Sequence, residues 1–505
     1  MEVYLGIDLG TSCVKTAFLD RDGNIPAVGS SDISLELPHP GYAEQDPAEW
    51  WEAVRLAVAE AKAKCPEAEI SGIGISGQML GTVLLDERGA LTDSCIIWLD
   101  QRADEENEEM KRLLGTEEIL RLTSNFPLVS YWAPKLLWLK KHKPEVYERT
   151  AHVLFPKDYL KYMLTGVMDI DATDAAGTGL FRTEKREWCE ALFEKLGISR
   201  SLVPESVSES VDVIGHVTKQ AAEFLGIREG VPVVGGGGDQ MCGAVGLGIV
   251  KEGMLSSTIG TSGCVFSYSE TCVTDMEPRA LLSYCHSVPG SWCVYGCTLS
   301  AGGSLRWLRD LLFDGEKSFS YMTDLAQQSV PGAEGLVFLP YLNGERTPHP
   351  NPDARGVFFG MSIRHTKADM IRSVMEGVAY SLRDTIEIMK AKGIRVKEVR
   401  AAGGGAVSEL WRQIQADVFG ARVVTTNVKE APATGAAMLA AVGAGAFESL
   451  AEAADKTVKP ETVTVPVEEH VKLYNDFYET YGKLYDQLED LFALQAGKVR
   501  RWEKK

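Results

Sequence analysis

Two glycine-rich turns place polar groups where a phosphorylated ligand could bind. The first is Asp8-Leu9-Gly10-Thr11-Ser12, which follows a short apolar strand pattern and is followed closely by Lys15. Its amides and hydroxyls could face phosphate oxygens, and Lys15 could add a cation. Phosphoryl transfer also needs a carboxylate that binds a metal ion, a role open to Asp8. For this turn alone, a plain hairpin in which Asp8 caps its own backbone is the better explanation of the same residues.

The second turn leaves a carboxylate at the tip of a glycine run. The stretch 231–234 reads as a buried strand, Gly235 to Gly238 follow it, and Asp239 and Gln240 come next. Glycines let the backbone approach a ligand closely. An aspartate at that point could take the proton from a hydroxyl that attacks a phosphate. The run lacks the spacing and the helix context of a dinucleotide-binding fingerprint.

A third glycine turn, at 403–406, joins a strand pattern that begins at Val399 to a helical pattern that runs from Trp411 to Val418. The N-terminus of a helix behind such a turn suits the phosphate or ribose of a nucleotide. Tight packing of the strand on the helix is about as good an explanation. None of the three turns decides the function by itself.

The elements around these turns alternate between strand and helix patterns, which predicts an α/β fold. Apolar alternation on both sides of the first turn, at 3–7 and 14–19, predicts a β-hairpin. Asp46 followed by Pro47 is typical of a helix start, and 70–76 reads as another strand.

The first turn has a counterpart near the middle of the chain. A strand pattern at 254–259 leads into Gly260-Thr261-Ser262-Gly263, so Gly-Thr-Ser occurs at 10–12 and again at 260–262. We interpret this as an internal duplication and place a domain boundary between 1–247 and 248–505. A chain of 505 residues exceeds the roughly 250–300 residues at which one core stops growing. From Ser449 onward the pattern predicts helices.

Composition narrows the class of protein. Lys and Arg number 52 and Asp and Glu 71, a net charge of −19, which disfavours broad contact with nucleic acid or anionic membrane. We find neither a membrane-spanning apolar run nor a secretory signal, and we expect a cytoplasmic protein. Cys285, Cys293 and Cys297 lie near His286. Reduced core thiols are a better explanation of that spacing than a metal site.

The order of the motifs resembles the FGGY carbohydrate kinase family, within the actin-like ATPase superfamily. The motifs DLGTS, GGGGD, GTSG and GGGA occur in that order, and 356–376 is similar to the second signature of the family. Five further segments resemble the xylulose kinases of this family. They are Glu44–Pro47, Ala133–Trp138, Pro156–Leu160, Asp174–Thr178 and Leu339–His349. The resemblance extends from about residue 4 to about residue 445.

The resemblance implies two actin-like (ribonuclease H-like) domains with a nucleotide cleft between them. It implies ATP- and Mg²⁺-dependent phosphorylation of a hydroxyl of a small sugar, a ketopentose such as xylulose or a related ketose or polyol. Asp239 would be the catalytic base, and Asp8, with Asp239 nearby, would hold the Mg²⁺. The residues implied to bind ATP are Thr11, Ser12, Lys15, Gly260, Thr261, Gly263, Gly302, Arg306, Gly404, Gly405 and Ser408. A homodimer is a further expectation.

The side that would bind the sugar departs from the xylulose kinase pattern. Leu80 and Leu99 stand where His and Asn are usual, and Gln240 stands where Asn usually follows the catalytic aspartate. The expected substrate-binding residues are Gln78, Met79, Leu80, Trp98, Asp100, Asp239 and Gln240. Because apolar walls discriminate weakly between hydroxylated ligands, a deoxy-sugar or a cyclitol is an alternative acceptor.

Other classes of protein explain fewer of these residues. An actin-like ATPase acting as a scaffold needs no acceptor base, so Asp239 and the Gly344-Glu345-Arg346 segment argue against it. A sugar sensor without kinase activity would be expected to have lost Asp8 or Asp239, and both are present. A nicotinamide-dependent oxidoreductase would rest on glycine richness alone.

Overall fold

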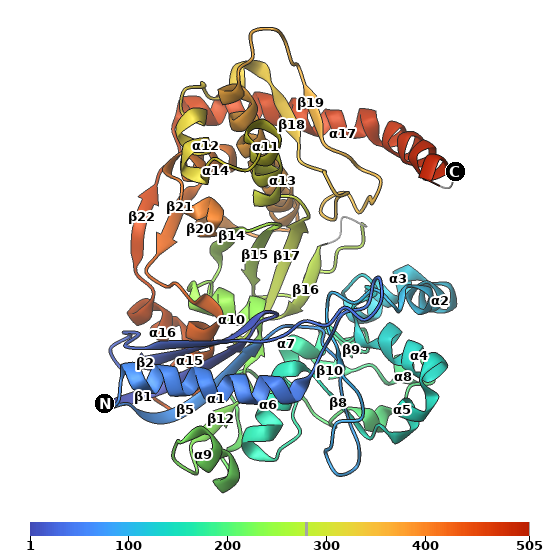
Figure 1. The fold of residues 1–505 in the computed structure, drawn as a ribbon, viewed down its shortest axis with the longest axis vertical. Coiled ribbons are helices and arrows are strands. Elements are labelled where there is room, and N and C mark those ends of the chain that lie inside the picture. Colours follow the sequence, from blue (N-terminus) through green and yellow to red (C-terminus); the bar gives the residue numbers. More distant parts are fainter. Residues whose placement is uncertain (278–280, 504–505) are drawn as a thin grey trace.

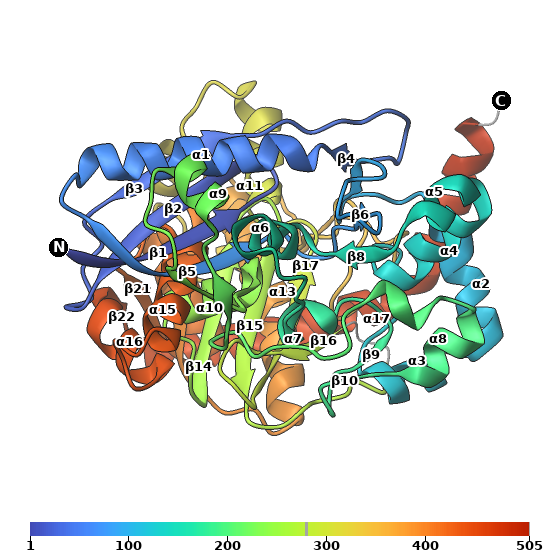
Figure 2. The ribbon, with the colours of Figure 1, turned by 90° about the horizontal axis from the view of Figure 1, so that it is seen from below.

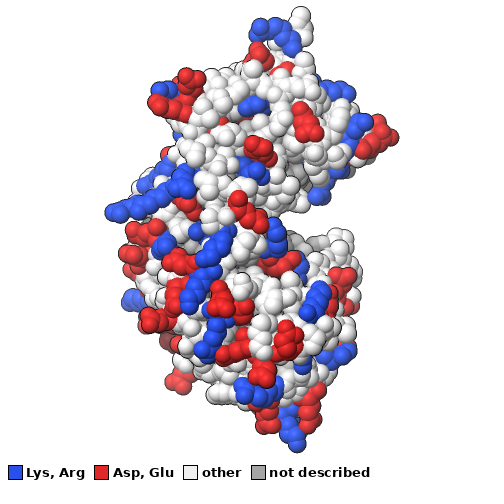
Figure 3. Space-filling view, turned by 90° about the vertical axis from the view of Figure 1, so that its left-hand side faces the viewer, with Lys and Arg blue, Asp and Glu red and all other residues white. Residues whose placement is uncertain are grey.

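The computed structural model describes residues 1–277 and 281–503. The chain forms two lobes, each built on a seven-stranded sheet (Figure 1). The sheet of the first lobe has the order β11-β12-β5-β1-β2-β3, with β13 paired to β5, and that of the second lobe has the order β16-β17-β15-β14-β20-β21-β22. The space-filling view shows an indentation between the lobes, with acidic and basic side chains interspersed on this face (Figure 3).

The strands and helices have the following bounds. The first sheet contains β1 (Glu2–Leu9), β2 (Cys13–Asp20), β3 (Val28–Asp32), β5 (Glu69–Gly77), β11 (Val213–His216), β12 (Pro232–Val234) and β13 (Gly237–Gly238). The second contains β14 (Gly253–Ile259), β15 (Gly263–Ser269), β16 (Leu282–Cys285), β17 (Trp292–Thr298), β20 (Val396–Gly403), β21 (Arg422–Thr426) and β22 (Pro460–Thr464). Short paired strands are β4 (Glu44–Gln45), β6 (Val83–Leu85), β7 (Cys95–Ile96), β8 (His152–Leu154), β9 (Phe181–Arg182), β10 (Glu187–Trp188), β18 (Val337–Leu339) and β19 (Val357–Phe359).

The helices of the first half are α1 (Pro47–Lys64), α2 (Asp104–Leu114), α3 (Thr116–Thr123), α4 (Trp132–His142), α5 (Pro144–Arg149), α6 (Pro156–Thr165), α7 (Ala172–Ala175), α8 (Glu190–Leu196), α9 (Lys219–Leu225) and α10 (Asp239–Gly246). Those of the second half are α11 (Gly302–Phe313), α12 (Phe319–Ala326), α13 (Lys367–Ala391), α14 (Glu409–Phe419), α15 (Ala431–Gly443), α16 (Leu450–Thr457) and α17 (Glu468–Glu503). Single 3₁₀ turns occur at Arg200–Leu202, Ala333–Gly335 and Gly404–Ala406.

The predicted hairpin around the first turn is present. β1 and β2 pair antiparallel, and β1 also pairs parallel with β5. The predicted helix start is present too, because the Asp46 side chain accepts a hydrogen bond from the amide of Ala48 at the beginning of α1. α1 covers one face of the sheet and α15 lies against the other (Figure 2). Thus α15, from late in the chain, completes the first lobe.

The second lobe repeats this arrangement around the second Gly-Thr-Ser turn. β14 and β15 form an antiparallel hairpin, and β14 pairs parallel with β20. The two Gly-Thr-Ser turns therefore occupy the same place in two similar hairpins, as the internal duplication predicted. All strands of the first sheet precede residue 248 and all strands of the second follow it, whereas α15 crosses back, so the proposed boundary at 247/248 separates the sheets but not every helix.

The C-terminal region differs from the prediction in one element. The helices α16 and α17 are present, but between them β22 pairs antiparallel with β21 and extends the second sheet. α17 packs on α13, where the Tyr474 hydroxyl donates to Oε1 of Glu376 at 2.7 Å. Among the described residues, no helix has both the length and the apolar character that crossing a membrane requires.

Candidate active site

Asp8 and Asp239 lie at the carboxyl ends of two strands that flank β5. Asp8 and Gly237 both have Ser76 of β5 as their Cα partner, one on each side, and Asp239 follows Gly237 by two residues. Adjacent strands lie about 4.8 Å apart, so these carboxyl ends share one edge of the sheet. The Ser76 hydroxyl donates to Oδ1 of Asp8 at 2.8 Å. The sheet thus brings together two residues that are remote in sequence.

The glycine run before Asp239 is shaped by close backbone contacts. Gly236 has φ +72°, and a Cβ there would collide with the carbonyl oxygen of Ile75. The amide of Gly238 donates to Oγ1 of Thr173 at 2.9 Å, and Gly237 lies beside Ser287 of the second lobe. Only glycine combines this conformation with this closeness, and the run delivers Asp239 to the first turn of α10 where the two lobes meet.

The surroundings of Asp8 and Asp239 disfavour the negative charge of both carboxylates. Burial raises the pKa of Asp239 from 3.8 to about 7, and the negative charge of Asp8 contributes to that shift. Burial likewise raises the pKa of Asp8 to about 6, against the opposing hydrogen bond from Ser76. Two carboxylates whose charge is disfavoured side by side are a fitting donor set for Mg²⁺, which prefers oxygen ligands.

The turn after Asp8 is held by side chains from other segments. Nε1 of Trp98 donates to Oγ1 of Thr11 at 2.9 Å, and Nε2 of Gln45 donates to the Thr11 carbonyl at 2.7 Å. Ser12 is exposed. Lys15, expected near the phosphates, forms an ion pair with Glu430 at 2.7 Å. Nothing in the sequence signalled Glu430, which is 415 residues away from Lys15.

A cavity of about 780 Å³ in the second lobe collects most of the expected nucleotide residues. Its lining includes Gly260, Thr261, Gly302, Arg306, Gly404, Gly405 and Ser408. Gly263 instead lies buried at the start of β15. Sequence reasoning missed the contribution of α12, which adds Phe319, Ser320, Thr323 and Asp324 to the wall. The volume is in the range of small-molecule sites.

Glycine is required where the cavity turns meet. The amide of Gly302 donates to the carbonyl of Gly260 at 2.8 Å, and a Cβ on Gly302 would collide with that oxygen. The Ser408 side chain accepts from the amide of Trp411 and caps α14. Gly302, the glycine turn at 403–406 and the start of α14 thus meet at the cavity.

Glu345 supports the segment that leads into this cavity. Its carboxylate accepts hydrogen bonds from Oγ1 of Thr298 at 2.5 Å and from the amide of Leu299 at 3.0 Å. Burial raises the pKa of Glu345 to about 7. The Gly344-Glu345-Arg346 segment, singled out in the sequence, therefore contacts the residues that precede Gly302.

Met79 and Gln240, two of the expected sugar-binding residues, lie beside Asp239 and the glycine run that precedes it. A Cβ on Gly238 would come within 2.8 Å of Cγ of Met79, so Met79 lies against the backbone beside Asp239. Leu80, half-buried and with φ +68°, packs toward Gly177 and Tyr284. Gln240 is exposed and hydrogen-bonds to Asp239. Gln78 is buried, and its Nε2 donates to Oε1 of Gln45 at 2.6 Å.

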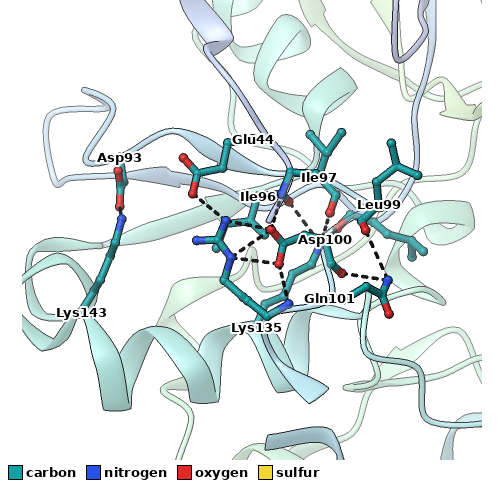
Figure 4. Close-up of polar contacts among 12 residues, drawn as sticks. Glu44, Asp93, Ile96, Ile97, Leu99, Asp100, Gln101, Lys135 and Lys143 are labelled. Atoms are coloured by element: carbon teal, nitrogen blue, oxygen red, sulfur yellow. Dashed lines mark hydrogen bonds and ion pairs between the residues drawn. The ribbon is translucent and has the colours of Figure 1, made fainter. Parts of the chain in front are cut away.

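The Trp98-Leu99-Asp100 segment divides between surface and interior. Trp98 and Leu99 are exposed, whereas Asp100 is buried. The Asp100 carboxylate accepts from Nε of Arg102 at 2.9 and 3.0 Å and from the amide of Ala43 at 2.7 Å (Figure 4). Its oxygens are thus occupied by protein donors.

Comparison with known proteins finds relatives that match nearly the whole length of the chain. Residues 3–246 match the N-terminal domain, and residues 255–444 the C-terminal domain, of the FGGY family of carbohydrate kinases. The chain is 39% identical to a xylulose kinase of Staphylococcus epidermidis over 494 residues, 97% of this chain and 98% of that protein. It is 37% identical to a xylulose kinase of Escherichia coli over 492 residues, 97% of this chain and all of that protein.

Solved structures of sugar kinases share the fold of this chain over nearly its whole length. The xylulose kinase of Rhodospirillum rubrum superposes with a TM-score of 0.92 at 31% identity and covers 97% of this chain and 100% of its own. A gluconate kinase of Lactobacillus acidophilus superposes with a TM-score of 0.90 at 27% identity, over 96% of this chain and 98% of its own.

Proposed function

The chain belongs to the FGGY family of carbohydrate kinases, and from this premise we propose that its acceptor is a hydroxyl of xylulose. The predicted fold, two actin-like lobes, is confirmed by the family match and by the solved relatives. The chain is a carbohydrate kinase that uses ATP as its phosphoryl donor. Since a gluconate kinase shares the fold, the choice of xylulose rests on the curated relatives and on the acceptor side of the site.

One observation carries the chemistry: Asp239 is half-buried where the lobes meet, with a pKa raised to about 7 by burial. A base with a pKa near the working pH transfers protons efficiently. In the proposed reaction Asp239 takes the proton of the sugar hydroxyl as its oxygen forms a bond to the γ-phosphorus of ATP. The bond from that phosphorus to the β–γ bridging oxygen breaks in line, and ADP leaves.

Asp8 would hold the Mg²⁺ that this transfer uses, with Asp239 beside it. When bound, Mg²⁺ neutralises charge on the phosphate oxygens. Thr11 and Ser12 on one lobe and the Gly260-Thr261 turn on the other would position the phosphates, while the second-lobe cavity takes the nucleotide. Because Lys15 is paired with Glu430, its contact with phosphate would require that ion pair to open.

The acceptor side favours a sugar that presents a carbon face to Leu80. This side chain packs toward Gly177 and Tyr284 and offers no hydrogen bond. A deoxy-sugar or a cyclitol meets that requirement as xylulose does, so both belong in the test. The homodimer and the cytoplasmic location expected from the sequence stay predictions.

The test measures ADP release from Mg-ATP with xylulose, other ketopentoses, gluconate, deoxy-sugars, polyols and cyclitols. The catalytic variant is Asp239→Ala, and the control is Asp86→Ala, in a turn near β6 where the Asp86 carboxylate accepts the amides of Arg88 and Ala90. Xylulose turnover that is lost in the first variant and kept in the second supports the proposal. If another acceptor has a higher kcat/KM, that compound is assigned as the substrate in place of xylulose. No stimulation above Asp239→Ala by any compound would overturn the assigned reaction.

A further inference from the structure

Lys135 is a buried lysine whose hydrogen-bond partners are backbone carbonyls. It lies in the first turn of α4 and is 1% exposed. Its Nζ donates to the carbonyls of Leu80 at 2.7 Å, Ile97 at 3.1 Å and Ile96 at 3.2 Å. Within residues 1–277 and 281–503, no carboxylate is hydrogen-bonded to it. Figure 4 shows Lys135 with Ile96 and Ile97, close to Asp100. Burying an ammonium is costly unless its donors are satisfied, and three carbonyls meet its three donors.

These carbonyls belong to two segments that carry residues of the acceptor side. Leu80 follows Met79, which lies against the backbone beside Asp239, and Ile97 directly precedes Trp98 and Leu99. One ammonium therefore ties together two loops that are separate in the sequence.

The same helix turn holds the next carbonyl as well. Nε1 of Trp132 donates to the carbonyl of Gly81 at 2.8 Å. Leu80 has φ +68°, a left-handed conformation that non-glycine residues adopt only when their surroundings hold it. Lys135 on the Leu80 carbonyl and Trp132 on the Gly81 carbonyl supply that hold from one rigid element.

We propose that Lys135 is a positioning residue for the acceptor sugar, which acts by fixing the backbone of Leu80 and of Ile96–Ile97 so that Met79, Leu80, Trp98 and Leu99 keep their places. Lys135 acts through these residues and does not touch the reacting atoms. The inference rests on the proposed sugar kinase function. The segment Ala133–Trp138, whose role the catalytic description left open, thereby gains one.

The electrostatic surroundings agree with this role. Burial lowers the pKa of Lys135 to about 7, while Cys95 and Asp100 oppose that shift and Arg102 adds to it. Arg102 is in turn paired with Glu44 at 2.6 Å. Above that pH the neutral amine has two donors for three carbonyls, so one carbonyl loses its partner.

The test replaces Lys135 by Met, which keeps the length of the side chain and removes its donors. We expect KM for the sugar to rise roughly ten- to hundredfold, as displaced binding groups do, with KM for ATP and kcat at saturating sugar changed less than about threefold. Lys135→Gln, which keeps two donors, should recover part of the loss. The rise of sugar KM above pH 7 that we expect in the wild type should be absent in Lys135→Met.

The matched control is Lys140→Met on the same helix. Nζ of Lys140 also donates to a backbone carbonyl, that of Gly197, at 2.8 Å, but it lies at the surface. We expect no change in either KM. A second control disrupts the Lys143–Asp93 ion pair, which Figure 4 shows apart from the Lys135 cluster, and it should likewise leave both KM values unchanged.

The outcomes separate the two proposals. If the wild type phosphorylates no sugar, the proposed function fails and this inference falls with it. If the wild type is active and Lys135→Met keeps the wild-type sugar KM, or loses sugar and ATP affinity equally, only the inference fails. Should Lys135→Met not fold, Trp132→Phe removes the link to Gly81 and keeps the stacking on Phe155. It should raise sugar KM in the same direction, and an unchanged value would overturn the inference.

Discussion

Replacing the catalytic base by its uncharged counterpart should make the protein more stable. Burial raises the pKa of Asp239 from 3.8 to about 7, so the folded protein holds that proton more tightly than the unfolded chain does. Between about pH 4 and pH 7 the folded state therefore binds more protons, and the wild type loses stability as the pH rises. Above pH 7 the loss is complete, and Asp239→Asn avoids it.

The size of the effect follows from the two pKa values. A difference between 3.8 and about 7 corresponds to about 4 kcal/mol as an upper bound. Asp239 is half-buried rather than enclosed, so water screens part of this, and Asp8 titrates over a neighbouring pH range. We expect about 2 kcal/mol in the free energy of unfolding, or roughly 4–8 °C in Tm for a domain of about 150–250 residues.

The assay is thermal unfolding of wild type and Asp239→Asn in EDTA at pH 5.5 and pH 8.5. The advantage of the variant should be larger at pH 8.5, and Mg²⁺ should reduce it by stabilising the wild-type carboxylate. Asp86→Asn is the control with the opposite sign, because backbone amides lower the pKa of Asp86 and its loss should destabilise at pH 8.5. A variant no more stable than the wild type at pH 8.5, or a difference independent of pH, would refute the reasoning.

Further predictions concern the two binding sites and the C-terminal helix. The kcat/KM for the sugar should fall about tenfold per pH unit below the raised pKa of Asp239, because the base becomes protonated; a flat profile between pH 5 and 7 would contradict this. Gly302→Ala should raise KM for ATP about tenfold or more, since its Cβ would strike a backbone oxygen, and Gly482→Ala in α17, where a Cβ meets nothing, should not; equal effects would argue against the nucleotide site. Leu80→His should raise xylulose turnover relative to that of a deoxy-sugar. Unchanged turnover of both sugars would show that Leu80 does not line the acceptor site. Tyr474→Phe should cost about 1–3 kcal/mol of stability, measured by denaturant unfolding, by leaving Glu376 short of a donor, and should leave both KM values unchanged; a raised KM would show that α17 influences the sites.

The sequence by itself identified the glycine turns and the start of α1. Gly236 and Gly302 sit where a Cβ would collide with backbone, and Asp46 caps α1 through its own neighbour. The cap can be read from a single sequence because Ala48 lies two positions after Asp46, whereas the carbonyl oxygens that make glycine necessary at Gly236 and Gly302 belong to Ile75 and Gly260, far away along the chain. The resemblance to the FGGY family implied Gly260, Gly302 and Gly404 as nucleotide-binding residues, and all three line the cavity.

Only the tertiary structure decided which partners the remaining side chains find. Lys15 was expected to bind ATP but pairs with Glu430. Asp100 was expected to bind the sugar, but its carboxylate accepts hydrogen bonds from Arg102. The ammonium of Lys135 satisfies carbonyls of two distant loops. A charged side chain binds the nearest partner of suitable geometry, and nearness across tens or hundreds of residues is created by the packing of strands and helices. The sequence therefore determined the kind of chemistry, and the assembled lobes determined which residues support it.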